Sequence, residues 1–479
     1  MGKLMKTSEA ENLRFFNTLT RTKEKFVPIE GGKVKMYTCG PTVYDYSHIG
    51  NFRAFLFEDL LRRWLEYRGF KVTQVMNLTD VDDKTIKGSI EEGKPLNEYT
   101  ERYIKAFFED VTRLNIQKAE YYPRATEHIP EMVSLIKKLF EKGYAYRGKD
   151  GSVYYDISKF KDYGKLARIK VEELKVGARV KADEYAKEEA RDFALWKAWD
   201  EQDGPVFWET EVGKGRPGWH IECSAMSMKY LGETLDIHCG GVDNLFPHHE
   251  NEIAQSEAAT GKKFVNYWLH NEWLLSEGKR MAKSFHNYYT LSDLMKKGYD
   301  AKAVRYLLLA THYRQQFNFT LEGLEAAKGA IERLTNFMYR LRDSDGEGSG
   351  ERAKLLMERV EKDFTEAMDD DLGISEALAA LFDFVREVNV LLDGNLLSKE
   401  DAQQVRSLMN SFDGVLGVVG EVKKEAKLSK EAEELVQKRE QARKAKDWKT
   451  ADQIREQLKA MGVIIEDTSQ GVKWRLEKR

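Results

Sequence analysis

The chain of 479 residues is 42% hydrophobic and carries a formal net charge of −3 at pH 7. Its length exceeds what one compact core holds, so two to four domains are expected, and the hydrophobic share excludes wholesale disorder. The sequence has no run of 18 apolar residues and no apolar signal segment, so we expect a cytoplasmic protein without membrane contact. Its three widely spaced cysteines do not suit a disulfide framework, which leaves metal binding or reactive thiols open.

Strand-like and helix-like segments alternate in parts of the chain. Strands are predicted at 33–38, 71–78, 234–238 and 264–269, and helices at 52–68 and from Pro247 to just before Gly261. A strand, a helix and a strand within residues 33–78 form a βαβ unit, which favours a parallel sheet.

The other segments differ in character. Residues 85–215 predict a mixed insertion with a hairpin near 152–160. From about residue 290 the chain is nearly all helical, with a loop at 343–350. Its C-terminal end predicts a helix followed by a hairpin.

A polar cluster follows each of the four predicted strands, at 39–42, 77–84, 238–244 and 270–273. In open α/β sheets, ligands bind outside the carboxyl ends of the strands. The clusters therefore predict one shared site at that edge of the sheet.

Two short motifs are suited to binding a nucleotide. The residues His48-Ile-Gly-Asn51 stand at a helix start, where free N–H groups and the helix dipole favour a phosphate, and Gly50 allows close approach. Downstream, Arg280 and Lys283 flank a short polar loop. Taken singly, the first motif also fits an ordinary helix cap, and the second fits a solvated charge cluster.

The order and distance of the two motifs resemble the His-Ile-Gly-His and Lys-Met-Ser-Lys-Ser signatures of class I aminoacyl-tRNA synthetases. The stretches CGPTVYDYSHIGN, NLTDVDDK, DFALWK, GRPGWHIECSAM, DIHCGGVDNLFPHHENEIAQSE and IEDTSQGVKWR are similar to cysteinyl-tRNA synthetase over nearly the whole chain. Asn51 replaces the last histidine of the first signature, which that family tolerates. Arg280 and Ala282 replace a lysine and a serine of the second, while Lys283 is retained.

The resemblance implies an α/β fold: a Rossmann-type parallel-sheet catalytic domain with an inserted connective domain, then a helical bundle anticodon-binding region and a small C-terminal α+β unit. The implied boundaries are 1–84 and 216–300 for the two catalytic halves, 85–215 for the insertion, 301–420 for the bundle and 421–479 for the terminal unit. The implied activity is that of a cysteine–tRNA ligase. Such an enzyme uses ATP with Mg²⁺ to form cysteinyl-adenylate and then transfers L-cysteine to the 3′ end of tRNA(Cys).

A metal site is predicted from two cysteines and a helical pair. Cys39 follows the first strand, Cys223 lies in WHIECSAM, and His248 and Glu252 are spaced to share one helix face. Two thiolates, an imidazole and a carboxylate suit Zn²⁺, although a single cysteine is more commonly a small buried hydrophobe. The resemblance implies one zinc per subunit that selects the cysteine thiolate over serine. We expect Glu252 to be its weakest ligand and Cys239 not to be a ligand.

The remaining site residues are implied by the resemblance. His48, Asn51, Arg280 and Lys283 would act in catalysis, and His48, Gly50 and Lys283 would bind ATP. Thr42, Thr79, Trp219 and His238 would contact the substrate, and Thr79 and Asp80 are expected to contact either the amino acid or the ribose of the nucleotide. Arg443, Asp452, Asp467 and Trp474 would contact the tRNA. Core packing of Trp219 and of one tail tryptophan, with surface ion pairs in the tail, is the structural alternative.

Two other functions remain open at this level. One is an ATP-dependent ligase of the same fold that attaches cysteine to a small amine, which would not need the helical half. The other is a non-catalytic tRNA-binding paralogue with a structural zinc, which would not need to keep His48, Gly50 and Lys283.

Overall fold

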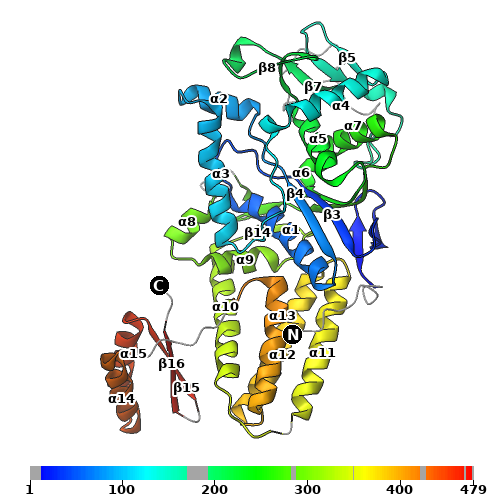
Figure 1. Cartoon of the computed structure of the whole chain (residues 1–479). Helices are drawn as coiled ribbons and strands as arrows, with labels where there is room; N and C mark the ends of the chain where they lie inside the picture. The colour runs from blue at the N-terminus through cyan, green and yellow to red at the C-terminus, as the bar shows by residue number, and fades with distance from the viewer. Residues whose placement is uncertain are drawn as a thin grey trace.

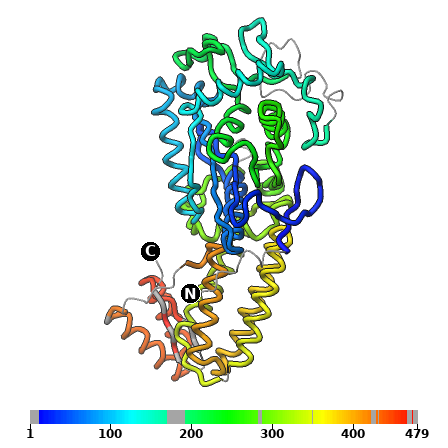
Figure 2. Tube along the Cα trace, turned by 45° about the vertical axis from the view of Figure 1, so that its right-hand side comes forward, coloured from blue at the N-terminus to red at the C-terminus, as the bar shows by residue number. Residues whose placement is uncertain are grey.

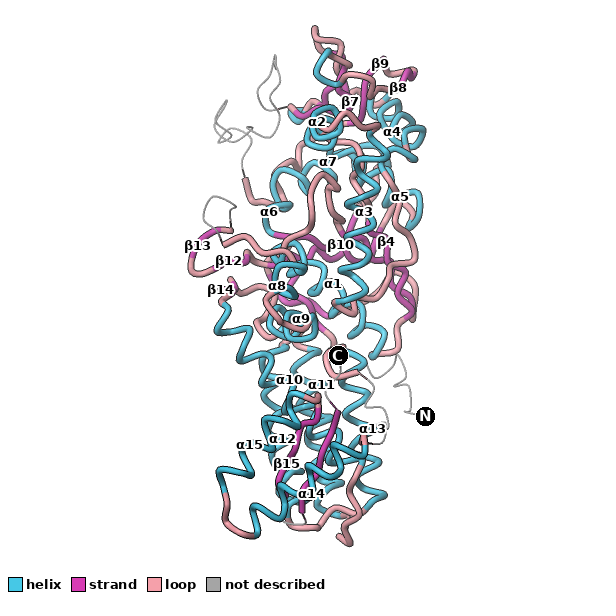
Figure 3. Tube along the Cα trace, turned by 90° about the vertical axis from the view of Figure 1, so that its left-hand side faces the viewer, coloured by secondary structure: helices cyan, strands magenta, loops and turns pink. Residues whose placement is uncertain are grey.

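The computed structural model describes residues 12–169, 192–281, 287–348, 350–420, 428–468 and 471–476. Three regions follow one another along an elongated molecule (Figure 1): a mixed α/β region, a layer around a parallel sheet, and a helical bundle. The C-terminal unit lies beside the bundle in two views (Figures 1 and 2). Strands gather in the sheet layers and in the C-terminal unit, whereas the bundle is helical (Figure 3).

The central sheet has the strand order β11–β10–β3–β4, and all neighbouring strands are parallel. Its strands are β3 (Lys33–Thr38), β4 (Lys71–Met76), β10 (Leu235–Gly241) and β11 (Val265–Asn271). Helix α1 (Ile49–Tyr67) joins β3 to β4 and packs on the sheet, which confirms the predicted βαβ unit and parallel fold class. Helix α5 (Trp219–Leu231) packs on β3 and β4 and against α7 (Glu250–Thr260).

Two of these helices begin elsewhere than the sequence predicts. Helix α1 begins at Ile49, ahead of residue 52, because its capping side chains belong to the preceding motif. Helix α7 begins at Glu250 and not at Pro247, because an irregular turn, Leu245–His249, comes before it. Both helix starts lie next to predicted site residues.

The insertion forms an antiparallel sheet with the strand order β5–β6–β7–β9–β8. Its strands are β5 (Ala145–Arg147), β6 (Val153–Tyr155), β7 (Phe193–Ala198), β8 (Trp208–Thr210) and β9 (Gly213–Pro217), and the helices of this stretch are α2 (Asp83–Glu91), α3 (Leu96–Arg113) and α4 (Ile129–Glu141). The hairpin is β5–β6, which begins earlier than predicted. Strand β9 runs past the predicted boundary at residue 215.

The chain is helical from α8 (Leu291–Lys296) onward, as predicted, through α9 (Ala301–Leu309), α10 (Leu321–Arg342), α11 (Glu351–Asp369), α12 (Ile374–Asp393) and α13 (Lys399–Leu416). The exception is β14 (Phe317–Phe319), which joins β12 (Leu274–Ser276) and β13 (Lys279–Arg280) in a small sheet. An N-terminal hairpin pairs β1 (Arg14–Asn17) with β2 (Thr22–Lys25). None of the described helices is long and apolar enough to cross a membrane.

The C-terminal unit contains α14 (Lys430–Lys444), α15 (Trp448–Ala460), β15 (Val463–Thr468) and β16 (Gly471–Leu476). Helix α15 and the antiparallel pair β15–β16 are the predicted helix and hairpin, and α14 precedes them. These elements share a small apolar core of their own around Leu458. They form a separate packing unit next to the bundle.

One carboxylate lies in the core without a partner. Glu58 of α1 is 0% exposed, and neither of its carboxylate oxygens has a hydrogen-bond donor among the described residues. Burial raises the pKa of Glu58 well above its ordinary value. Folding therefore disfavours the charged form of this side chain.

Replacing Glu58 by methionine should stabilise the protein by about 1–3 kcal/mol at about pH 7, because an apolar side chain needs no buried partner. A raised folded-state pKa means that the wild type loses stability as the pH rises from the unfolded-state pKa towards the folded-state one. The gain in thermal unfolding temperature should hence be small near pH 4 and larger near pH 7. Glu66→Met, which removes a carboxylate paired with Arg62 on the same helix, is the control; an equal, pH-independent shift in both variants would contradict the interpretation.

Candidate active site

One cavity of about 700 Å³ opens at the carboxyl edge of the central sheet. Residues after β3 and β4, at the ends of β10 and β11, and at the start of α1 line it. The predicted site residues in its wall are Cys39, Thr42, His48, Gly50, Asn51, Thr79, Trp219, Cys223, His248 and Arg280. The strand-end clusters of the sequence thus converge on a single site.

The N-terminus of α1 faces this cavity. His48 is the helix cap: its Nδ1 accepts the Asn51 N–H at 3.3 Å, and Asn51 Oδ1 accepts the His48 N–H at 3.0 Å. A Cβ at position 50 would lie 2.8 Å from the His48 ring, so glycine is required for this ring position. The Ile49 N–H donates to the Tyr289 carbonyl and the Asn51 N–H to His48, so the Gly50 N–H and the positive end of the helix dipole are what this turn offers an anion.

Arg280 reaches the same cavity from β13, where it is exposed. It brings a positive charge to the cavity that the helix start also lines, as the second motif predicts. Lys283 and Ala282 lie outside the described residues. Of the predicted nucleotide group, His48, Gly50, Asn51 and Arg280 therefore share one cavity.

The four predicted metal ligands come together. The ligand atoms of Cys39, Cys223, His248 and Glu252 all lie within 4.8 Å of one another. A second set, Cys39, His238, His249 and Glu252, meets the same limit and shares two members with the first. Cys239 belongs to neither set, and its side chain packs in the apolar core.

The pKa values of the four predicted ligands show that their combined negative charge favours a bound cation. Burial would raise the pKa of Cys223, but contact with the Cys39 thiol, and then His248, lowers that pKa to about 6. Burial would lower the pKa of His248, but Cys223 and Glu252 raise it to about 10. Burial and then the neighbouring Cys223 raise the pKa of Cys39 well above its usual range. The cluster of negative groups thus retains protons, and a cation can replace them.

Glu252 supplies a further sign that a cation fits. Its side chain is 0% exposed, and its Oε1 lies 3.1 Å from His248 Nε2. This oxygen nevertheless accepts no well-aligned hydrogen bond from the described residues. A buried carboxylate oxygen without a hydrogen-bond donor can accept a cation instead. Together with two sulfurs and an imidazole, it makes up a donor set that Zn²⁺ prefers.

Histidines surround the first metal set, and sequence reasoning missed most of them. His220 Nδ1 lies 2.9 Å from His248 Nδ1, and His238 Nε2 lies 3.0 Å from Glu252 Oε2. His249 Nε2 lies 3.3 Å from Cys39 Sγ, and its Nδ1 lies 2.7 Å from His270 Nε2. Such second partners fix the orientation of a ligand side chain. Five of the nine histidines lie at positions 220 to 270, and this concentration in the sequence could have indicated that histidines surround the metal set.

The predicted substrate residues separate into two groups. Thr42, Thr79 and Trp219 line the cavity, and the Trp219 ring stacks on His248 at a centroid distance of 4.2 Å. His238 is not among the lining residues, because it is fully buried behind Glu252. Asp80 is not among them either, because it accepts hydrogen bonds from the backbone and hydroxyl of Thr126. For these two residues a direct substrate contact is not supported.

Sequence reasoning also missed Glu222, which lies next to Cys223 on α5. Its side chain is buried, and its Oε2 accepts a hydrogen bond from Thr79 Oγ1 at 2.9 Å. This bond fixes the hydroxyl of a cavity-lining residue. The single sequence gives no signal for it, because the two residues are far apart in the chain.

The predicted tRNA contacts all lie in the C-terminal unit. Arg443 is in α14, Asp452 in α15 and Trp474 in β16. Asp467 is in β15, but its side chain is not among those that the structure describes. The Arg443 guanidinium lies over the ring of Trp448, 5.7 Å from its centroid, and Trp448 is 57% exposed. An exposed indole paired with an arginine is a surface on which a nucleic acid base can stack.

Comparisons with known proteins agree with this geometry. Residues 25–329 match the family model of the class I (C) tRNA synthetase catalytic domain, residues 363–420 the DALR domain, and residues 425–475 the cysteinyl-tRNA ligase anticodon binding domain. A cysteine–tRNA ligase of Protochlamydia amoebophila is 53% identical, with 98% of each chain covered. One of Brachyspira hyodysenteriae is 50% identical, covering 97% of this chain and 99% of its own.

Solved structures share the fold at low identity. Methionyl-tRNA synthetase of Mycobacterium tuberculosis with methionyl-adenylate has a TM-score of 0.58 and 14% identity, covering 81% of this chain and 90% of its own. A LeuRS from Agrobacterium radiobacter in a ternary complex with tRNA has a TM-score of 0.58 and 12% identity, covering 83% and 86%. With the family models and the near full-length relatives, these findings show that the chain belongs to the cysteine–tRNA ligase family of class I aminoacyl-tRNA synthetases.

Proposed function

We propose that this chain activates L-cysteine with ATP and transfers it to the 3′ end of tRNA(Cys). The observation that carries the proposal is the shared cavity. Cys39, Cys223 and His248 of a donor set suited to a thiolate-binding metal line the same cavity as the N-terminus of α1, which is suited to a phosphate. A thiol-bearing amino acid and a nucleotide can therefore meet in one place.

Cys39, Cys223, His248 and Glu252 are the residues that would hold Zn²⁺. When bound, the metal would supply a Lewis acid that takes up the substrate sulfur as a thiolate and prefers it to a hydroxyl oxygen. A preference of about 4 kcal/mol would give about a thousandfold selection of cysteine over serine. An apolar pocket alone separates such near-isosteres by only about 1–3 kcal/mol.

The surrounding residues hold this donor set in one arrangement. His220 occupies Nδ1 of His248 and so leaves Nε2 to face Glu252. His238 binds the second oxygen of Glu252, which makes His238 an orienting residue rather than a substrate contact. Trp219 stacks on His248 and gives the cavity a rigid apolar wall.

Activation joins the cysteine carboxylate to the α-phosphate of ATP and releases pyrophosphate. Such a displacement depends on position and on neutralising charge. The start of α1 with His48 and Asn51 would hold phosphate oxygens, and Arg280 in the same cavity would neutralise charge, with Mg²⁺ on the nucleotide. Lys283 stays a prediction of the sequence motif. The terminal adenosine of the tRNA then takes the cysteinyl group from the adenylate.

The C-terminal unit would recognise the anticodon. Unpaired loop bases are read by stacking and hydrogen bonds, for which the Trp448–Arg443 pair and the carboxylate of Asp452 are suited. A small-amine acceptor would need no such unit, and a non-catalytic paralogue would need no nucleotide cavity. Aminoacylation of tRNA and ATP turnover, respectively, separate these two alternatives from the proposed function.

Cysteine should support ATP–pyrophosphate exchange, and serine should support it about a thousandfold less well. Cys223→Ser should lose zinc and lower the cysteine-dependent exchange by at least about a hundredfold, because a hydroxyl is a poor zinc ligand. Cys239→Ser makes the same chemical change at a buried cysteine outside both ligand sets and should keep its zinc.

Zinc content and exchange are measured on the same preparations. Exchange that persists in a zinc-free Cys223→Ser protein would make the metal irrelevant to activation. Exchange absent from folded wild type would favour the non-catalytic paralogue.

Zinc binding to the metal-free protein should release about two protons per zinc at about pH 7. His248, with a pKa of about 10, and Cys39, with a raised pKa, are protonated there, whereas Cys223, with a pKa of about 6, is mostly ionised. Near pH 5 the release should approach three, because Cys223 is then protonated as well. Release in a weakly buffered indicator solution measures this, and a value that does not change with pH would contradict the assigned ligands.

A further inference from the structure

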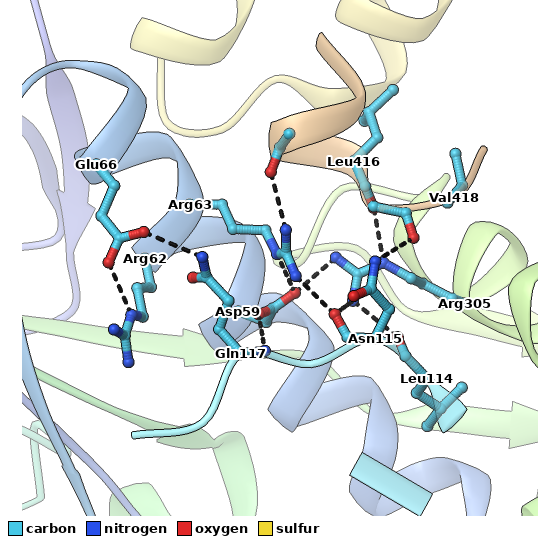
Figure 4. Close-up of polar contacts among 12 residues, drawn as sticks. Asp59, Arg62, Arg63, Glu66, Leu114, Asn115, Gln117, Arg305, Leu416 and Val418 are labelled. Atoms are coloured by element: carbon cyan, nitrogen blue, oxygen red, sulfur yellow. Dashed lines mark hydrogen bonds and ion pairs between the residues drawn. The ribbon is translucent and has the colours of Figure 1, made fainter. Parts of the chain in front are cut away.

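The C-terminal end of helix α13 is held by side chains from α1, from the loop after α3 and from α9 (Figure 4). Arg63 Nη1 donates to the Gly414 carbonyl at 2.9 Å, and Arg305 Nε to that of Leu416 at 2.6 Å. Asn115 Nδ2 donates to the Gly417 carbonyl at 2.9 Å. The last carbonyls of a helix lack partners within it and carry the negative end of its dipole, so cationic and amide donors satisfy them.

Asp59 of α1 lies at the centre of these donors. Its Oδ2 accepts hydrogen bonds from Arg305 Nη2 at 2.6 Å and Arg63 Nε at 2.8 Å, and its Oδ1 accepts the Gln117 N–H at 2.7 Å. Arg305 also donates to the carbonyls of Leu114 and Asn115. We call Asp59, Arg63, Asn115 and Arg305 the exit clamp.

The two central charges of the exit clamp are removed from water. The side chains of Asp59 and Arg305 are both 0% exposed. A buried ion pair is commonly no more stabilising than an apolar pair of similar volume, so its presence is not explained by stability alone. What such a pair provides is a fixed geometry between the elements that carry it.

The two ends of this connection lead to different functional regions. Helix α1 runs in one piece from Asp59 back to its first turn, where His48, Gly50 and Asn51 line the cavity. Helix α13 ends at Leu416 and packs against α10 and α11 in the helical bundle, of which residues 363–420 match the DALR domain.

Arg53 strengthens the same assembly. It donates from α1 to the Leu308 carbonyl at 2.5 Å and to the His312 carbonyl at 3.0 Å, at the end of α9. Helices α1 and α9 are thereby joined at two points, by Arg53 and by Arg305. A displacement of the α13 exit must then move α1 as a body or break these bonds.

We propose that Asp59, Arg63 and Arg305 are positioning residues that register the helical bundle, which would contact the tRNA, to the start of α1 in the active cavity. None of the three touches the cavity, so they act on the reaction through α1. This inference rests on the proposed function. The effect of anticodon recognition on catalysis would then depend on the bonds at the C-terminal end of α13.

The experiment compares Arg63→Met with Arg62→Met. Arg63→Met removes the bonds from α1 to Gly414 and Asn115 and leaves the Asp59–Arg305 pair. Arg62 precedes it on the same helix, and the side chains of both arginines are 9% exposed. The partners of Arg62 are Glu66, Gln74, Lys118 and Glu120, none of them in α13. The pair is therefore matched in helix, burial and charge.

Two activities are measured for each variant and for wild type. The first is cysteine-dependent ATP–pyrophosphate exchange without tRNA. The second is kcat/KM for aminoacylation of tRNA(Cys) transcripts with the native anticodon and with one anticodon base changed. In Arg63→Met, exchange should stay within about twofold of wild type, while the native-to-changed anticodon ratio should fall by about fivefold or more. Arg62→Met should leave that ratio unchanged.

A merely structural role would lower exchange and both aminoacylation rates in proportion and keep the ratio constant. An unchanged native-to-changed anticodon ratio in Arg63→Met, or an equal fall of that ratio in Arg62→Met, would overturn this inference and leave the proposed function standing. Arg305→Lys, which retains a cation beside Asp59, should keep more of the ratio than Arg305→Met, and the reverse order would count against the inference. Wild type without any cysteine-dependent exchange would overturn the proposed function, and this inference with it.

Discussion

The site depends on the crowding of two thiols and one carboxylate in a space where water is excluded. The ligand atoms of Cys39, Cys223 and Glu252 lie within 4.8 Å of one another. Like charges so close cannot all ionise at low dielectric without a cation. The protein alone meets this constraint by keeping protons on His248 and Cys39, whose pKa values are raised. A divalent metal meets it with all four ligands deprotonated.

The rest of the architecture supplies the geometry for that crowding. Parallel strands deliver Cys39 to the same edge of the sheet as the starts of α5 and α7, which carry Cys223 and Glu252. The same edge receives the N-terminus of α1, because α1 follows directly on β3. One topological feature, a parallel sheet with helices after its strands, therefore brings the two thiols and the N-terminus of α1 into one cavity.

Much of this arrangement could be predicted from the sequence. Alternating residues located β3 and β4, and the spacing of His248 and Glu252 placed them together although His248 lies in the turn before α7. Long-range packing explains the misses. The role of His238 behind Glu252 depends on the contact between β10 and α7, which no local pattern encodes. Strand β14 is three residues long and forms only beside β12.

The exit clamp could not be read from the sequence either. Asp59 and Arg305 are separated by 246 residues. Most partners of Arg305 are backbone carbonyls, which every residue has, so the amino-acid sequence does not indicate them. The family resemblance located residues that line the cavity or form the buried metal set, because these stand in motifs. It did not locate the residues that hold one element against another, since their spacing varies with the fold and not with the chemistry.

Whether the metal site takes up the substrate sulfur is the central question, and absorption of the cobalt-substituted protein addresses it directly. Co²⁺ in place of zinc should show a thiolate-to-metal charge-transfer band from Cys39 and Cys223. Addition of cysteine should strengthen this band, because a third thiolate joins the metal, and addition of serine should leave it unchanged. A band that does not respond to saturating cysteine would contradict the account and make the metal purely structural.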